Sequence, residues 1–260
     1  MKTIILAGGF GSRMREETEY KPKPMVEIGN KPILWHIMMN YNFYNQKDFL
    51  VCMGYKKESI IEYFLDFNSL GEDIEVKLGN NNDFSFFDNK KELKDVKVLL
   101  SDTGLKTNTG ERIRRVKKHF SKGEKFMMTY GDGLSDVNIK ELIAFHETHD
   151  GIATFTATKP ESRFGVIQTD DNNLVTSFDE KGQIENRINC GFMVLDYEVF
   201  DYIEENDNFE QQTLKKIASD KKLYAFNHDG YFHPMDTYRE YKYLNSLWEE
   251  NKAPWKTWND

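Results

Sequence analysis

The sequence predicts an α/β protein whose central sheet is mostly parallel and covered by helices on both faces. Short apolar runs, long enough for buried strands, alternate along the chain with stretches of helical periodicity. A glycine-rich loop, Gly8, Gly9 and Gly11, follows the first of these runs, and α/β sheets bind ligands at such strand ends. One consistent pattern extends over all 260 residues, so we expect a single domain spanning residues 1–260.

The first part of the chain contains two predicted strands, each followed by a helix. Thr3–Leu6 is a short apolar run that predicts a buried strand. Pro32 suits a first helical position, and apolar residues then recur at helical spacing to about Tyr44. Phe49–Met53 predicts the next strand, and a helix is expected near Glu58–Phe67.

The middle of the chain continues this alternation. Strands are expected at Val96–Leu100, Lys125–Tyr130 and Ile152–Ala157, each of them an apolar run. Helices are expected at Gly110–Phe120, which is basic, and at Asn138–His149. The strand-helix-strand order favours parallel pairing of the strands.

The last third changes character and contains more β structure. Phe164–Thr169 and Leu174–Phe178 alternate in polarity about an Asp-Asp-Asn-Asn turn and predict a hairpin. Residues 79–95 are polar and lack a clear period, so we expect a mobile insertion there. The remaining elements are expected to be a strand at Asn189–Leu195, helices at Phe209–Ser219 and Tyr238–Glu250, and an aromatic tail at Trp255–Trp258.

Composition and charge exclude several classes of protein. The net charge is −8 and no polybasic run is present, which argues against non-specific nucleic-acid binding. No apolar stretch approaches the ~20 residues of a membrane span, and the N-terminus enters a strand almost at once, so neither a membrane anchor nor a signal peptide is expected. Cys52 and Cys190 lie in apolar runs and are expected to be buried free thiols of a cytoplasmic protein.

The glycine loop predicts a site for a polyanion. Backbone without Cβ atoms passes close to a ligand and directs its N–H groups at phosphate oxygens. Arg13 adds a positive fork that suits phosphate, and Lys23 is held between Pro22 and Pro24 in a stiff segment. The loop lacks the Lys-Ser/Thr of a P-loop, and Met14 stands where a dinucleotide fingerprint needs a small residue. A triphosphate is the polyanion that this pattern favours.

Two carboxylates at predicted strand ends suit a magnesium ion. Asp132, between two glycines, follows a buried strand, and Mg²⁺ prefers one or two carboxylates with phosphate oxygens and waters. Asp236 directly precedes a predicted helix, and from the residues alone a helix N-cap is about as well supported there as a metal ligand. Asp136 is expected to cap the helix that begins near Asn138. The histidines form no triad or metal pair, and His146, with His149, is expected on an exposed helix face.

A longer string of motifs resembles a known family. Leu-Ala-Gly-Gly-Phe-Gly-Ser-Arg at residues 6–13, followed by Pro-Lys-Pro at 22–24, is similar to the signature of the sugar-1-phosphate nucleotidylyltransferases. The segments 16–29 and 31–38 resemble one branch of them, the glucose-1-phosphate cytidylyltransferases. The resemblance extends from Met1 to Lys256. It implies a Rossmann-like nucleotidyltransferase fold, with a mixed, mostly parallel sheet flanked by helices and a small β-rich acceptor region.

The resemblance also implies an activity. CTP and α-D-glucose 1-phosphate would give CDP-glucose, a precursor of deoxysugars and surface polysaccharides, and pyrophosphate. The acceptor phosphate oxygen would attack the α-phosphorus in line, so catalysis would be mainly positioning and charge neutralisation. Mg²⁺ would be the cofactor, and no nucleic-acid or membrane partner is expected. Family members assemble as hexamers, so a homo-oligomer is expected.

The family's pattern assigns roles to particular residues of this sequence. Asp132 and Asp236, the latter in a Pro-Met-Asp-Thr segment, would hold the metal, and Arg13 and Lys23 would be catalytic. The nucleotide-binding residues would be Leu6, Ala7, Gly8, Gly9, Phe10, Gly11, Ser12, Arg13, Lys23, Thr107, Arg112 and Gly131. The sugar-phosphate-binding residues would be Arg163, Glu180, Lys181 and Asn189.

The chain departs from the family's pattern at three positions, where Glu111 and Cys190 each replace a glycine and Gly182 replaces a proline. Other activities therefore stay open, namely the same transfer with another base or sugar phosphate, and a metal-dependent glycosyltransferase. The latter class favours an Asp-x-Asp at a strand end, and the segment around Asp132 is not one. A non-catalytic sugar-nucleotide sensor would be favoured by the loss of Lys23 or Asp132, and both are present.

Overall fold

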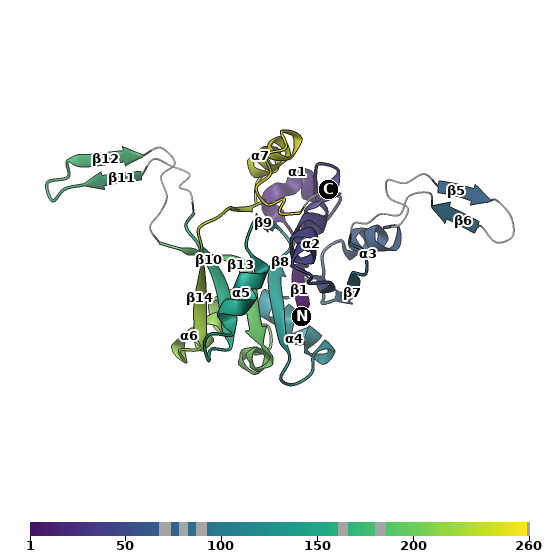
Figure 1. The fold of residues 1–260 in the computed structure, drawn as a ribbon, viewed down its shortest axis with the longest axis horizontal. Helices are drawn as coiled ribbons and strands as arrows, with labels where there is room; N and C mark the ends of the chain where they lie inside the picture. The colour runs from purple at the N-terminus through teal and green to yellow at the C-terminus, as the bar shows by residue number, and fades with distance from the viewer. Residues whose placement is uncertain (68–73, 78–82, 87–92, 161–165, 180–185, 259–260) are drawn as a thin grey trace.

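A seven-stranded sheet forms the centre of the protein in the computed structural model, which describes residues 1–67, 74–77, 83–86, 93–160, 166–179 and 186–258 (Figure 1). The strand order is β14-β10-β13-β8-β1-β4-β7. These strands are β1 (Lys2–Ala7), β4 (Asp48–Met53), β7 (Lys97–Asp102), β8 (Lys125–Tyr130), β10 (Ala153–Thr158), β13 (Ile188–Asp196) and β14 (Leu223–His228).

The sheet is mostly parallel, as the sequence predicted. Strand β13 is the exception, because it pairs antiparallel with β8 on one side and with β10 on the other. The other neighbouring strands pair in parallel. Six of the strands were predicted to within one or two residues at most of their ends. The edge strand β14 was not predicted, because its residues alternate only weakly in polarity.

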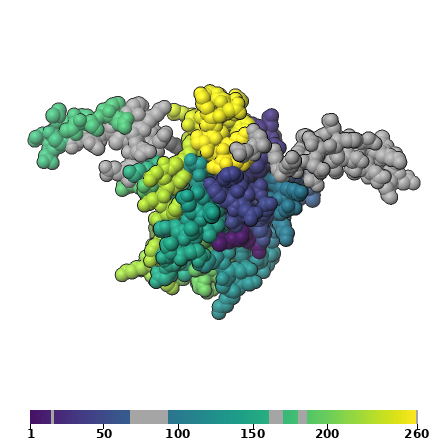
Figure 2. All heavy atoms as spheres, viewed as in Figure 1, coloured from purple at the N-terminus to yellow at the C-terminus, as the bar shows by residue number. Residues whose placement is uncertain are grey.

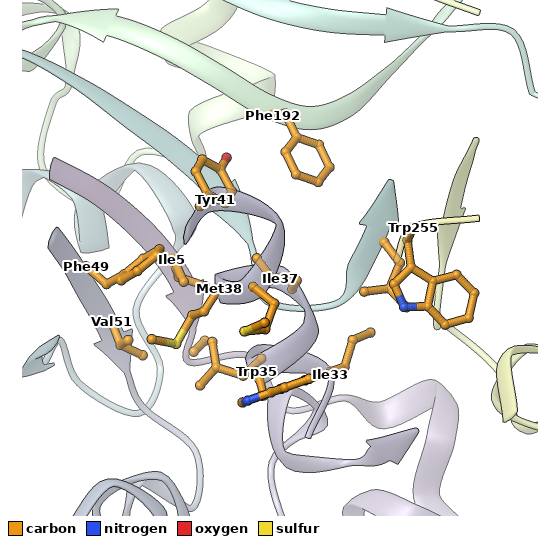
Figure 3. Packing of buried hydrophobic residues seen from close by; sticks show 14 of the residues in the cluster. Ile5, Ile33, Trp35, Ile37, Met38, Tyr41, Phe49, Val51, Phe192 and Trp255 are labelled. Atoms are coloured by element: carbon orange, nitrogen blue, oxygen red, sulfur yellow. The ribbon is translucent and has the colours of Figure 1, made fainter. Parts of the chain in front are cut away.

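Alternate residues of each central strand support two separate hydrophobic clusters, one on each face of the sheet. In β1, Ile5 faces the first cluster and Ile4 the second, because successive side chains of a strand point to opposite faces. The first cluster is packed by α2 (Ile33–Phe43), α5 (Ile139–His146) and α7 (Tyr238–Glu249), and Figure 3 shows its centre. The second is packed by α4 (Thr109–Val116) and α6 (Leu214–Ser219).

The predicted helices form, with local differences at their ends. Pro32 is the N-cap of α2 and not its first helical residue. The predicted basic helix ends at Val116, and a short 3₁₀ turn (Lys117–His119) follows it. The predicted helix 209–219 begins with a π-helical turn, Phe209–Thr213, before α6. The remaining helical segments are α1 (Arg15–Thr18), α3 (Lys57–Leu65) and 3₁₀ turns at Ser12–Met14, Lys23–Met25 and Tyr197–Tyr202.

Two of the small two-stranded pairs lie apart from the main sheet (Figure 1). The predicted hairpin forms from β11 (Val166–Thr169) and β12 (Val175–Asp179). The expected insertion at 79–95 contains a strand that the sequence did not indicate, since β6 (Asp83–Phe86) pairs with β5 (Ile74–Lys77). Residues 78–82 and 87–92 lie outside the described part, so mobility there stays a prediction.

The C-terminal tail packs against the N-terminal half of the chain (Figure 2). Trp255 is buried, and its indole Nε1 donates a hydrogen bond to Nδ1 of His36 over 3.3 Å. The other ring nitrogen of His36 donates to the Ile28 carbonyl over 2.8 Å, so this buried histidine is neutral. No helix in the described part of the chain is long and apolar enough to cross a membrane.

Two polar residues do not lie where the sequence predicted. His146 is fully buried, not exposed, and its ring nitrogens contact the Thr154 hydroxyl and the Asp196 carboxylate at 2.8 and 3.0 Å. Asp136 does not cap α5, because Asn138 does. Asp136 instead accepts from the backbone N–H of Tyr231 and pairs with a histidine. In both cases a tertiary partner far along the chain satisfies the polar group.

Candidate active site

A cavity of about 330 Å³ opens at the carboxyl ends of β1 and β8. This is the edge at which parallel α/β sheets bind ligands, because the loops after neighbouring strands diverge there. Its lining residues come mainly from the glycine loop, from the Lys23 segment, from the start of α4 and from the end of β8. They are Leu6, Ala7, Gly9, Gly11, Ser12, Arg13, Lys23, Pro24, Thr107, Asn108, Thr109, Arg112, Tyr130, Gly131, Asp132 and Asn208.

Most of the predicted nucleotide-binding residues line this cavity. Gly8 and Phe10 are not among the lining residues, and the Phe10 ring is half-exposed beside Tyr55. Gly9 has no neighbour within 4 Å of a Cβ position, so it is the glycine of the loop with the most open surroundings. Position 11 favours glycine for a different reason, because its backbone has a positive φ of 62°.

The absence of a side chain at Gly8 leaves space for the side chain of Arg112 and not for a ligand in the cavity. A Cβ atom there would lie 2.1 Å from the guanidinium of Arg112. That guanidinium donates to the carbonyls of Gly8 and Gly104, over 2.9 and 2.8 Å, and to the Thr103 hydroxyl over 2.7 Å. Arg112 is only 3 % exposed. The arginine therefore joins the glycine loop to the loop after β7, and both of its terminal nitrogens already donate to protein groups.

Glu111, which stands where the family has a glycine, is buried beside Arg112. Its carboxylate pairs with Arg114 over 2.6 Å and with Arg115 over 2.9 Å. The hydrogen bond to Arg114, with that to Arg115, lowers the pKa of Glu111 to about 2. These two arginines hold Glu111 in the first turn of α4.

Lys23 connects the two carboxylates that the sequence predicted as metal ligands. Its Nζ lies 2.7 Å from Asp132 and 2.5 Å from Asp236, and Arg13 lies 2.8 Å from the other oxygen of Asp236. Lys23 is only 8 % exposed. Burial alone lowers the pKa of Lys23, but the ion pairs outweigh it and the pKa is raised. Burial likewise raises the pKa of Asp236, and Lys23 outweighs it, so that pKa is lowered.

Residues 132 and 236 meet because two short strands pair beside the main sheet. Strand β9 (Gly133–Ser135) pairs antiparallel with β15 (Phe232–Pro234), and the N–H of Met235 donates to the carbonyl of Asp132 over 2.8 Å. Asp236 thereby follows a strand that runs back toward Asp132, although the two are distant in sequence. Their carboxylates form a local pair of hard oxygen ligands of the type that Mg²⁺ prefers.

The structure excludes a capping role for the Asp236 side chain. The N-cap of α7 is Thr237, whose hydroxyl accepts from the backbone of Glu240, and the Glu240 carboxylate accepts in turn from the N–H groups of Asp236 and Thr237. This is a complete capping box. The Asp236 carboxylate is therefore free to interact with Lys23 and Arg13.

Of the four residues predicted to bind the sugar phosphate, the structure describes Asn189. Arg163, Glu180 and Lys181 lie outside the described residues, so their positions stay predictions. Asn189 is exposed at the start of β13, and its side-chain oxygen accepts from the Gly191 N–H over 2.8 Å. Sequence reasoning missed several cavity residues, Pro24, Asn108, Thr109, Tyr130 and Asn208. Three of these residues had a local signal in the sequence. Asn108 and Asn208 each precede a predicted helix, and Tyr130 directly precedes Gly131-Asp132.

A cavity bounded by a glycine loop, with Arg13, Lys23 and Asp132 in its lining and Asp236 in contact with both cations, defines an α/β protein suited to binding a nucleotide and a divalent metal. The chain belongs to the nucleotidyl transferase family, whose pattern matches residues 2–260. The resemblance seen in the sequence is thereby confirmed, and so is the fold class.

Individual relatives narrow the comparison. The chain is 46 % identical to a glucose-1-phosphate cytidylyltransferase of Salmonella typhi, over 99 % of this chain and 100 % of the relative. It is 39 % identical to a probable glucose-1-phosphate cytidylyltransferase of Bacillus subtilis, again over 99 % of this chain and 100 % of the relative. The fold is similar to that of HddC from Yersinia pseudotuberculosis, with a TM-score of 0.68 and 23 % identity over 95 % of this chain and 99 % of HddC.

Proposed function

We propose that the protein transfers the cytidylyl group of CTP to α-D-glucose 1-phosphate, forming CDP-glucose and releasing pyrophosphate. The observation that carries the chemistry is a cluster of ion pairs, in which Lys23 contacts Asp132 and Asp236, and Arg13 contacts Asp236. All of these residues except Asp236 line the glycine-loop cavity. The choice of CTP and glucose 1-phosphate rests on similarity to glucose-1-phosphate cytidylyltransferases over the whole chain.

The residues of the chain would act chiefly by positioning charge. Gly9, Gly11 and Ser12 line the cavity, and the backbone N–H groups of this loop would hold the triphosphate. Arg13, whose side chain is 72 % exposed, has the reach to follow the departing pyrophosphate. Lys23 would neutralise the charge that develops between the α-phosphorus and the leaving group. No nucleophilic side chain is required, because the acceptor phosphate oxygen itself attacks the α-phosphorus.

Asp132 and Asp236 fit a magnesium ion. Both carboxylates lie within 2.7 Å of one ammonium group, so a single cation reaches both of them. The described residues contain no cluster of three or more His, Cys, Asp or Glu side chains that could hold a metal. A metal at the two aspartates would complete its shell with phosphate oxygens and waters, as Mg²⁺ commonly does. When bound, it would neutralise the phosphates and order them for in-line attack.

Lys23 would change partners when a metal binds. Its ammonium lies in contact with both carboxylates, and a divalent ion between them would repel it. We expect the lysine then to turn toward the phosphates of the nucleotide. The loss of two ion pairs would be offset by contacts with a triphosphate, whose oxygens are stronger partners for an ammonium than water is.

Oligomerisation and location belong to the same proposal. We expect a homo-oligomer, a hexamer as in the family, acting in the cytoplasm in the supply of deoxysugar and polysaccharide precursors. Arg163, Glu180, Lys181 and Asn189 would bind the sugar phosphate. Sedimentation analysis of the purified protein checks the assembly, and a monomer at micromolar concentration would contradict it.

The function is tested by measuring pyrophosphate release with each of the four ribonucleoside triphosphates, combined with several sugar 1-phosphates. We expect CTP with glucose 1-phosphate to give the highest kcat/KM, with dependence on Mg²⁺. If another combination of nucleoside triphosphate and sugar 1-phosphate gives the highest kcat/KM, the protein is still a nucleotidyltransferase but the proposed substrates are wrong. Sugar transfer from a sugar nucleotide, without pyrophosphate release from any pair, would indicate the glycosyltransferase alternative.

A further inference from the structure

Glu210 lies in the π-helical turn that follows the loop 204–208, behind the wall of the cavity. It does not line the cavity, but both of its carboxylate oxygens accept hydrogen bonds from residues that do. One oxygen accepts from the Tyr130 hydroxyl in a short contact, and the other accepts from the Thr109 hydroxyl over 2.8 Å. A single carboxylate thus connects two separate parts of the cavity wall.

Tyr130 is the part of the wall that lies next to the Asn189–Gly191 segment, where Asn189 is the residue proposed above to bind the sugar phosphate. It ends β8 directly before Gly131 and Asp132, and its ring lies against Gly191 of β13. A Cβ atom at residue 191 would lie 2.4 Å from that ring, and Gly191 has a φ of 89°. The Tyr130 hydroxyl donates to the Glu210 carboxylate at the end of the ring opposite the backbone. Its ring presents an apolar face next to the Asn189–Gly191 segment.

Thr109 is the part of the wall that lies at the start of α4. Its hydroxyl accepts from the Phe209 N–H over 2.9 Å and donates to Glu210. Thr107 and Asn108 precede it and line the same cavity. The close approach of α4 to the loop before Glu210 leaves no space for a side chain at Gly110, where a Cβ atom would lie 2.8 Å from the Asp207 carbonyl.

We propose that Glu210 is a positioning residue that sets the Tyr130 ring for the sugar phosphate and the Thr107–Thr109 segment for the nucleotide. Glu210 touches neither substrate, and Tyr130 is a specificity-determining residue of the acceptor side. This inference rests on the proposed function, because the two substrates define the two sides of the cavity. Since one carboxylate holds both walls, its loss affects the binding of both substrates, whereas loss of either hydroxyl affects one.

Three variants test the proposal through separate readouts. Tyr130→Phe keeps the ring and removes the hydroxyl, so the KM for the sugar phosphate is expected to rise about fivefold or more while that for the nucleotide is unchanged. Thr109→Val is expected to weaken nucleotide binding by a similar factor, measured by titration calorimetry with CTP and Mg²⁺ in the absence of acceptor. Glu210→Ala is expected to show both effects, each about tenfold.

The double variant Tyr130→Phe/Glu210→Ala separates positioning from independent structural effects. If Glu210 acts on the acceptor through the Tyr130 hydroxyl, the acceptor KM of the double variant equals that of Glu210→Ala alone. Multiplying effects would overturn the proposal, as would unchanged affinities in Glu210→Ala. Should Glu210→Ala fail to fold, Glu210→Gln serves in its place, because an amide oxygen accepts one of the two hydroxyls and its NH₂ group accepts neither.

Matched controls separate failure of this inference from failure of the proposed function. Glu204→Ala removes a neighbouring carboxylate that pairs with Lys216 at the surface, and we expect kcat and both KM values to stay unchanged. If the wild-type protein uses another nucleotide or sugar phosphate, the proposed substrates fail and the same cycle is measured with the preferred pair. If the wild-type pair is as proposed and the variants show no coupling, the inference fails alone.

Discussion

At the scale of single residues, the site is organised by one buried lysine. Lys23 contacts Asp132 and Asp236 at once, and Arg13 completes the charge balance on Asp236. The lysine thus has two functions in this site. It neutralises two carboxylates that would otherwise repel each other at short range, and it places a cation beside the glycine loop.

Replacement of Lys23 by alanine is expected to lower kcat about 10²–10³-fold, because one cation at developing charge contributes on that order. The control is Lys21→Ala, which removes a lysine that pairs with Glu27 at the surface and is expected to keep the turnover of the wild type. Steady-state kinetics and thermal unfolding of both variants make the comparison. Near-normal turnover in Lys23→Ala would remove this residue from the reaction.

Replacement of Asp236 by asparagine is expected to raise the Mg²⁺ concentration needed for half-maximal rate, and Asp132→Asn to do the same. Each change removes one anionic ligand from a hard cation while keeping the side-chain volume. Activity is measured against Mg²⁺ concentration in each variant. If both variants need the same Mg²⁺ concentration for half-maximal rate as the wild type, the metal binds elsewhere.

The matched control for Asp236 is its neighbour. Thr237→Ala removes the N-cap hydroxyl of α7 and is expected to lower the free energy of unfolding by about 1 kcal/mol, with an unchanged magnesium requirement. The two adjacent variants should therefore separate stability from metal dependence.

At the scale of elements, the glycine loop is shaped from behind by Arg112. Two glycines, Gly8 and Gly54, approach its guanidinium so closely that a Cβ atom would lie 2.1 Å from it at residue 8 and 2.6 Å from it at residue 54. The loop thereby gains a rigid support at residue 8 and stays open at residue 9. Buried guanidinium hydrogen bonds to carbonyl groups fix backbone position without any contribution from a ligand.

The two adjacent glycines are expected to respond differently to alanine. Gly8→Ala should lower the free energy of unfolding by about 1–3 kcal/mol, because the new methyl group overlaps an arginine that five acceptors hold in place. Gly9→Ala has open space and should stay within ~0.5 kcal/mol of the wild type. Chemical denaturation measures both, and equal losses would show that Arg112 does not constrain the loop.

At the scale of the whole molecule, the C-terminal tail closes the core over α2. His36, fully buried, contacts Trp255 and lies against Trp248 with ring centroids 4.6 Å apart. Burial lowers the pKa of His36 to about 4. The neutral ring is therefore part of the packing between the first and last segments of the chain.

The stability of the fold is expected to depend on pH through His36. Below pH 6.5 His36 becomes protonated in the unfolded chain, whereas in the folded chain it stays neutral down to about pH 4. The free energy of unfolding therefore falls as the pH falls through this range. The full loss amounts to about 3 kcal/mol. The free energy of unfolding, measured in urea between pH 7 and 4.5, should fall less in His36→Gln than in the wild type. Parallel pH profiles would assign the acid sensitivity to other groups.

Local sequence indicated most of the elements and several residues of the candidate site. Apolar runs and helical spacing fixed six strands of the sheet and most of its helices, because these patterns follow from burial of one or two faces. The glycine loop, Lys23 and Asp132 were identified because their residue types adjoin predicted strand ends. These signals lie within a few residues of each other and need no knowledge of distant contacts.

Tertiary structure decided what each polar group does. The role of Asp236 could not be chosen from sequence, because both a cap and a ligand fit before a helix, and only the β9–β15 pairing places it beside Asp132. Glu210 lacked any local signal, since Tyr130 and Thr109 reach it from 80 and 101 residues away. The burial of His146 could not be predicted for the same reason, because its partner Asp196 is 50 residues away in the sequence. The role of a polar side chain depends on the groups that it contacts. Groups that are distant in sequence come into contact only when the sheet has formed.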